Sequence, residues 1–109
     1  SFAVALNKNT GEELWRAARD EVSSWSTPLI IEHAGRPQAV ISATTRVRSY
    51  DLGSGKVLWE CGGLSNNVVA SPVAGGGFLY AASSYEFSWH DVLHEPFIKR
   101  VERGCVVSP

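Results

Sequence analysis

The sequence predicts an all-β fold of short antiparallel strands, and three observations support this class. Short segments rich in Val, Ile, Leu, Tyr and Trp alternate with Gly, Pro or polar clusters, as they do in sheet proteins. These segments recur in the same order along the chain. The composition, with 44% apolar and 19% charged residues, is that of a packed globular domain. The 109 residues have room for one small domain, residues 1–109.

The recurrence is an internal repeat. Two stretches align at an offset of 44 residues, namely ALNKNTGEELW at 5–15 and SYDLGSGKVLW at 49–59. Gly, Leu and Trp coincide in the two stretches, and the same offset aligns residues 26–29 with residues 70–73. Beyond them the offset falls to 39, which we attribute to a shorter loop in the second copy. A period of about 40 to 45 residues built from short strands is typical of the blades of a β-propeller.

The strands of one repeat follow from the same signals. One copy contains four candidate strands, at 28–32, 38–43, 46–51 and 56–61. The turn from Asp51 to Gly55 supplies two glycines where a hairpin needs positive φ, and an Asp or Asn at its start can bond its own backbone. Residues 11–22 have a helix-forming composition. Because the repeat aligns them with the short segment 56–61, we predict a strand there instead.

The chain therefore divides into about two four-stranded antiparallel blades and a tail. We expect a half blade at 2–22, a full blade at 26–62, a partial blade at 69–90, and a divergent tail at 91–109. The tail is predicted to be strand-like through Trp89 and helical or irregular afterwards. A closed propeller needs 4 to 8 blades, so this chain cannot close a ring alone. It is a fragment of a longer propeller, a unit that assembles in several copies, or a short variant whose tail covers the exposed edge.

The repeated stretches resemble the tryptophan-docking motif of the pyrroloquinoline-quinone-like propeller repeats. The matching residues are Gly11 and Trp15 in one copy and Gly55 and Trp59 in the other. The resemblance covers about residues 2 to 84 and implies that each Trp stacks on a neighbouring blade, where the Gly turn allows close approach. We therefore predict that Trp15 and Trp59 are structural and largely buried.

The same resemblance implies two possible functions. The family contains non-enzymatic bacterial repeat proteins, and this branch predicts a scaffold that binds protein or self-associates, outside the cytoplasm and without a cofactor. The alternative is part of a quinone-dependent alcohol dehydrogenase, which would hold pyrroloquinoline quinone and Ca²⁺. The enzymes need a set of Glu, Asn and Asp ligands and usually a disulfide between adjacent cysteines. Cys61 and Cys105 are 44 residues apart and no such acidic cluster is evident, so we favour the scaffold.

The linkers that precede each blade are the candidate ligand surface. Loops on one face of a propeller carry its binding residues, and the two linkers occupy matching places in the repeat. The candidates are Trp25, Asn66 and Asn67, with cationic contacts from Arg46 and Arg48. For Trp25 the commoner fate is packing between blades, and for the two arginines it is a solvated strand edge.

Other chemistry has little support in the sequence. A formal charge of −1 gives no footprint for nucleic acid, and no apolar run is long enough to insert in a membrane. His90 and His94 have helical i, i+4 spacing for a metal, but exposed polar residues are the commoner interpretation. We expect His33 to be a solvated loop residue and residues 75–77 to be a hairpin turn rather than a phosphate cradle. Two cysteines without metal spacing predict buried or free thiols.

Overall fold

The computed structural model describes residues 1–21, 24–64, 70–82 and 105–107, and all regular structure in these residues is β-strand. The strands are β1 (Phe2–Leu6), β2 (Glu13–Ala18), β3 (Leu29–His33), β4 (Arg36–Ala43), β5 (Arg46–Asp51), β6 (Val57–Gly62), β7 (Val73–Gly75), β8 (Phe78–Tyr80) and β9 (Cys105–Val107). Every pairing is antiparallel. The predicted all-β class is confirmed, including a strand rather than a helix at residues 13–18. The described residues form no closed ring, so the propeller stays a prediction.

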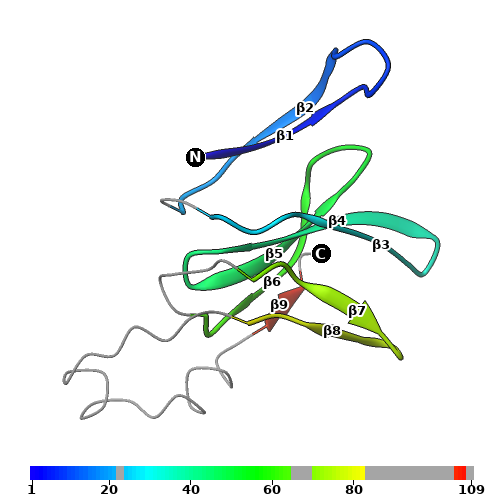
Figure 1. Ribbon diagram of the computed structural model, residues 1–109. Helices are drawn as coiled ribbons and strands as arrows, with labels where there is room; N and C mark the ends of the chain where they lie inside the picture. Colours follow the sequence, from blue (N-terminus) through cyan, green and yellow to red (C-terminus); the bar gives the residue numbers. More distant parts are fainter. Residues whose placement is uncertain (22–23, 65–69, 83–104, 108–109) are drawn as a thin grey trace.

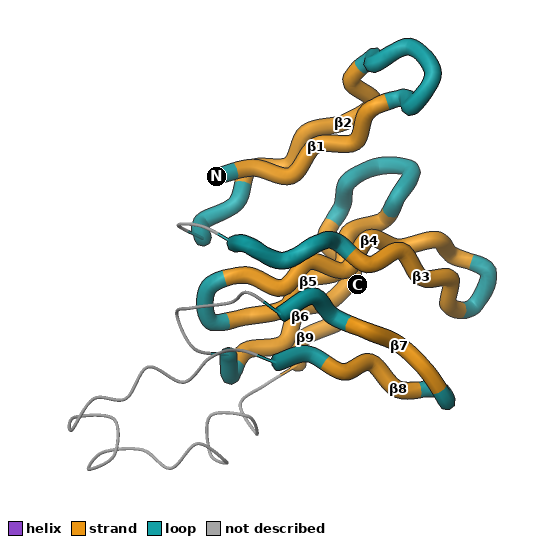
Figure 2. Tube along the Cα trace, viewed as in Figure 1, coloured by secondary structure: helices purple, strands orange, loops and turns teal. Residues whose placement is uncertain are grey.

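The strands form three layers (Figure 1). The central sheet has the order β3-β4-β5-β6-β9, and it lies between the hairpins β1-β2 and β7-β8. Figure 2 shows that strands and loops alone make up all three layers. On one side, Trp15 and Ala17 of the N-terminal hairpin pack against a buried cluster that contains Ile41 and Tyr50 of the sheet. On the other side, Trp59 and Leu79 line a cleft between the sheet and the hairpin β7-β8.

Because the central sheet is covered on both faces, its strands bury residues of both parities. In β5, Val47 and Ser49 lie on the face toward β7-β8, and Tyr50 lies on the face toward the N-terminal hairpin. Both Ser49 and Tyr50 are almost fully buried. The alternation of apolar and polar residues that marks a one-sided sheet is therefore absent from this strand.

The hairpins β1-β2 and β5-β6 are structural copies of each other. Ala5 pairs with Trp15 as Ser49 pairs with Trp59, and each hairpin has a register shift at the next residue. The backbone N–H of Gly11 donates to the Asn7 carbonyl at 2.7 Å, and that of Gly55 donates to the Asp51 carbonyl at 2.8 Å. The two glycines have φ values of +78° and +79°. The repeat that the sequence indicates at an offset of 44 is thus present in the backbone hydrogen bonds.

The hairpins β3-β4 and β7-β8 form a second pair of copies, and here one expectation is wrong. Both hairpins turn through two residues of positive φ, Ala34–Gly35 and Gly76–Gly77. The second copy is shorter because its strands lose residues, not because its loop is shorter. His33 is consequently the last residue of β3 and not part of a loop, although it is exposed as expected. The hairpin turn predicted within residues 75–77 is found.

Strand β9 adds a fifth strand to the central sheet by pairing with β6 (Figure 1). Residues 105–107 of the tail are therefore extended rather than helical, and the rest of residues 91–109 lies outside the described residues. Cys61 is opposite Cys105 in the register, and Cys61 is disulfide-bonded. The expectation of a free thiol at Cys61 is wrong, because the backbone brings the two segments of the chain together at this pair.

Candidate functional site

The first candidate is the contact between Trp15 and the β5-β6 turn. The indole N–H of Trp15 donates to the carbonyl of Leu52 at 2.7 Å. Its ring stacks on Tyr50, with ring centroids 6.2 Å apart and an interplanar angle of 23°. A Cβ placed on Gly55 would lie 2.6 Å from Trp15 Cε3, so only glycine fits beneath the ring. Trp15 is half-buried, which is less than the large burial predicted from the sequence. The packing of its ring on the turn of Gly55 is the contact that a docking role would require.

Gly11, the counterpart of Gly55, has different surroundings. Its backbone conformation is the same, but a Cβ placed there would meet nothing within 4 Å. Trp59, the counterpart of Trp15, donates its indole N–H at 3.0 Å to Gln38 Oε1 within its own sheet. The same amide oxygen accepts the buried Ser49 hydroxyl at 2.7 Å. Trp59 is also half-buried, and its outer side lines the cleft toward β7-β8. In the described residues no turn covers Trp59 as the β5-β6 turn covers Trp15.

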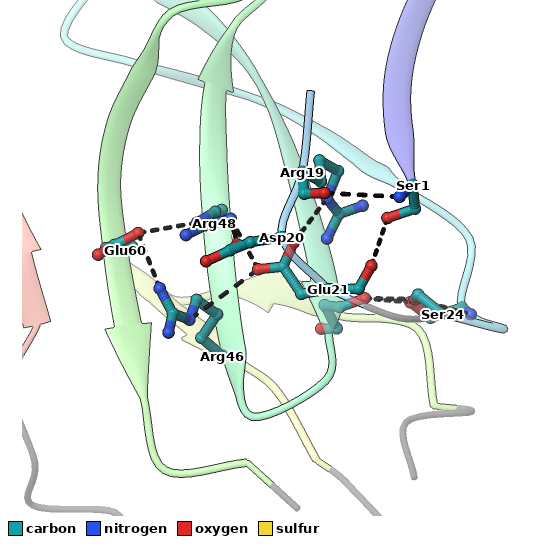
Figure 3. A network of polar contacts seen from close by, with 10 residues as sticks. Ser1, Arg19, Asp20, Glu21, Ser24, Arg46, Arg48 and Glu60 are labelled. Atoms are coloured by element: carbon teal, nitrogen blue, oxygen red, sulfur yellow. Dashed lines mark hydrogen bonds and ion pairs between the residues drawn. The ribbon is translucent and has the colours of Figure 1, made fainter. Parts of the chain in front are cut away.

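The second candidate is an ion cluster between the end of the N-terminal hairpin and the central sheet (Figure 3). Its members are Arg19, Asp20, Glu21, Arg46, Arg48 and Glu60. Nη1 of Arg48 lies 2.6 Å from Asp20 Oδ1 and 2.7 Å from Glu21 Oε1, and its Nε lies 2.8 Å from Glu60 Oε2. The side chain of Glu21 is only 3% exposed. Three cations and three anions thus balance in a cluster whose centre, formed by Arg19, Glu21 and Arg48, is buried, while Asp20 is exposed.

This arrangement changes the role expected for the two arginines. Arg46 and Arg48 were expected to contact a ligand or to lie at a solvated strand edge. Instead Arg46 pairs with Glu21 at 3.9 Å and with Glu60 at 3.7 Å, and Arg48 is shared among three carboxylates. Burial by itself lowers the pKa of Arg48, but hydrogen bonds to Asp20 and Glu60 outweigh it and raise the pKa overall. Arg48 therefore stays charged and fixes the segment after β2 onto the sheet.

The same charges act on their neighbours. The hydrogen bond from Arg48 holds the pKa of Asp20 below its ordinary value. Burial raises the pKa of Tyr50, against the opposing charges of Arg19 and Arg48. The Tyr50 hydroxyl and Nη2 of Arg19 are buried without a hydrogen-bond partner. A cleft of about 610 Å³ lies beside Arg19 and Tyr50. The Tyr50 hydroxyl and Nη2 of Arg19 are nevertheless closed off from solvent, so a ligand in this cleft would not contact them.

Only one of the predicted linker residues can be placed. Trp25 is 73% exposed, so packing between blades is wrong for this residue. The serines on either side of it, Ser24 (labelled in Figure 3) and Ser26, both donate to the carbonyl of Ser42 and hold the linker on the sheet. The backbone N–H of Thr27 donates to the hydroxyl of Ser71, its counterpart in the next copy, at 2.8 Å. Asn66 and Asn67 lie outside the described residues, as do His90 and His94.

Two apolar surfaces at the ends of the stack were not predicted from the sequence. The outer face of the N-terminal hairpin exposes Phe2, Val4, Leu6 and Leu14, and that of the hairpin β7-β8 exposes Val73, Phe78 and Tyr80. The first surface could have been found, because large and small residues alternate strictly from Phe2 to Leu6. We call the first set the N-terminal end surface and the second set the C-proximal end surface.

No family model, curated protein or solved structure matches this chain. Among the residues that the structure describes, no helix is long and apolar enough to cross a membrane. No group of three His, Cys, Asp or Glu residues that could hold a metal ion occurs in those same residues.

Proposed function

We propose that this chain is a β-propeller-type repeat unit that acts as a non-catalytic protein-interaction scaffold. The central sheet would be one blade, and the two hairpins would be halves of the blades on either side. The repeated hairpin geometry and the ring of Trp15 on the Gly55 turn support this proposal. The disulfide at Cys61 fits the extracytoplasmic location that the resemblance to the quinone-type repeats implies.

One observation carries the scaffold role, namely the exposure of the two end surfaces. Phe2, Val4 and Leu6 are the counterparts of Arg46, Arg48 and Tyr50, which the N-terminal hairpin and the segment after it cover in the central sheet. A surface that is buried in one copy of the repeat is thus exposed and apolar in the other copy. Burial of one such side chain contributes about 1.5–3 kcal/mol, so a matching protein surface would bind here.

A peptide selection tests the scaffold role. Random peptides of about ten residues, long enough to add a strand, are displayed and selected on the immobilised protein. We expect alternating apolar peptides whose binding is lost in Leu14→Asp and kept in Lys8→Asp, a matched change in the exposed turn of the same hairpin. Failure to select peptides, or binding that Leu14→Asp leaves intact, would overturn the proposal.

The catalytic alternative has its own test. The protein is assayed for dye-linked oxidation of primary alcohols with pyrroloquinoline quinone and Ca²⁺ added. We expect no turnover above the rate of the quinone alone. Turnover that depends on the protein would replace the scaffold proposal with the dehydrogenase.

A further inference from the structure

We propose that the two ends of the stack bind each other between copies of this chain, with strand β8 of one copy pairing antiparallel with strand β1 of the next. The inference rests on the repeat arrangement of the proposed function and names a second copy as the partner. It follows from the counterparts of the two strands. The hairpin β7-β8 is a copy of β3-β4, and the hairpin β1-β2 is a copy of β5-β6.

In the central sheet these two kinds of hairpin are joined, because β4 pairs with β5. In the described residues neither β8 nor β1 has a second neighbour. Each copy of the chain therefore carries the two halves of one further four-stranded sheet, and they are located at opposite ends of the stack (Figure 1). An unpaired edge strand is a template for pairing with another chain.

The central sheet also fixes the register of the new pair. Leu29 pairs with Val40, and its counterpart Val73 pairs with Tyr80, so Tyr80 corresponds to Val40. The strand pairing thus gives an offset of 40 here, in place of the 39 expected from the sequence alignment. Val40 is opposite Ser49, whose counterpart is Ala5. Tyr80 of one copy is therefore opposite Ala5 of the second copy.

The space for the incoming hairpin is present. A cleft of about 460 Å³ runs along β1 and over Ile30, Ala39 and Ile41 of the central sheet. Ile30 is 56% exposed there, although Ala39, its partner on the same face of the sheet, is buried. The C-proximal end surface supplies the apolar side chains that would fill this cleft, because Phe78 and Tyr80 are 67% and 57% exposed.

The same arrangement would bring together Trp59 and Gly11, the two docking residues that have no docking contact within the described part of one chain. Trp15 lies on the turn of Gly55 in β5-β6, the equivalent hairpin of the next repeat in its own chain. By the same geometry, Trp59 of one copy would lie on the turn of Gly11 of the second copy. Gly11 has the backbone of a docking glycine and open space where the ring would be. The N-terminal end surface of the second copy would then cover the face of the central sheet that carries Trp59.

The contact is head-to-tail, so it produces a closed ring or an open filament. Because propellers have 4 to 8 blades and each copy would supply two, a closed ring would contain about two to four copies. Sedimentation velocity over micromolar concentrations tests the contact. We expect assemblies heavier than the 11.8 kDa chain. Phe78→Asp on the inserting side and Ile30→Asp in the cleft should each return the mass to that of one chain, while Trp25→Ser should assemble as the wild type does.

Cross-linking tests the register. Protein carrying Tyr80→Cys is mixed with protein carrying Ala5→Cys and oxidised, and the control mixture replaces Ala5→Cys with Leu6→Cys, which places the thiol on the opposite face of β1. We expect a disulfide-linked pair in the first mixture only. Equal cross-linking in both mixtures, a wild type that stays at 11.8 kDa, or assembly that survives Phe78→Asp would overturn the inference. A wild type that stays monomeric and still selects peptides would leave the scaffold proposal intact. A wild type that assembles, with a dissociated Phe78→Asp chain whose free N-terminal end surface selects no peptide, would refute the scaffold role alone.

Discussion

The hairpins β1-β2 and β5-β6 have equivalent strand pairing, the same register shift and the same kind of turn. They differ in which residues pack against them. The turn of β5-β6 lies under the ring of Trp15, and the strands of this hairpin carry arginines and a glutamate of a buried ion cluster. The turn of β1-β2 is open, and its outer strand positions are apolar and exposed. Local sequence therefore determines the hairpin, while its position in the stack determines whether the same residues are docking contacts or free surface.

The largest effect is expected from removing the ring that joins the two hairpins. We expect Trp15→Ala to lower the free energy of unfolding by about 4 kcal/mol, because it removes the stacking on Tyr50 and opens a cavity over the turn. Trp25→Ala is the matched control, since Trp25 is 73% exposed, and it should cost less than about 0.5 kcal/mol. Urea unfolding measures both. Equal costs for the two tryptophans would mean that the hairpin is not docked through Trp15.

The next effect tests the ion cluster, to which the strands of the β5-β6 hairpin contribute Arg46, Arg48 and Glu60. Glu21→Gln removes one carboxylate from among three arginines, and we expect a loss of about 3 kcal/mol because the buried Arg19 and Arg48 each lose a charged partner. The ion pair of Glu13 with Arg16 in the other hairpin is half-exposed, so Glu13→Gln should cost under about 0.5 kcal/mol. Chemical denaturation of both variants provides the comparison. If Glu21→Gln is as mild as Glu13→Gln, the cluster is solvated.

The two turn glycines provide the closest comparison. Both have φ near +80°, so an alanine at either position costs about 1–2 kcal/mol of backbone strain. Gly55→Ala also drives a methyl group into the Trp15 ring, and we expect it to cost about 2 kcal/mol more than Gly11→Ala in the monomer. Thermal unfolding at low protein concentration separates the two. A larger cost at Gly11 would reverse the proposed difference between the turns.

The smallest effect is a pH dependence that distinguishes the two turns. A hydrogen bond from the Ser54 hydroxyl, aided by Arg36, lowers the pKa of Asp51 below its ordinary value of 3.8. The carboxylate therefore adds stability above that value, and the contribution is lost as the pH falls through the lowered pKa. Asn7 accepts the matching turn hydrogen bonds with an amide that does not titrate. Of the two turns, amide exchange followed by NMR should detect loosening at low pH in the turn from Asp51 to Lys56 and not in the turn of Asn7, and Asp51→Asn should abolish the difference.

How much of the fold and of the candidate site could be predicted from the sequence depends on how far apart along the chain the contributing residues are. Gly, Asn or Asp, and Trp at repeated positions predicted both hairpins, because turn chemistry and strand spacing are local. The ion cluster was missed because Glu21 and Asp20 follow the aligned stretch, and nothing local indicates which arginines they meet. Strand β9 and the disulfide at Cys61 were missed for the same reason. Their partners lie more than 40 residues away, so they depend on the tertiary path of the chain.

The contact between Trp15 and Gly55 is central to the proposed repeat packing, and a double-mutant cycle measures this contact directly. The free energy of unfolding is determined for Trp15→Ala, Gly55→Ala, the double variant and the wild type. We predict that in the Trp15→Ala background the cost of Gly55→Ala falls to that of Gly11→Ala, because only the backbone strain is left. If Gly55→Ala costs the same with and without the ring, the hairpin does not dock on this turn and the repeat packing proposed here is wrong.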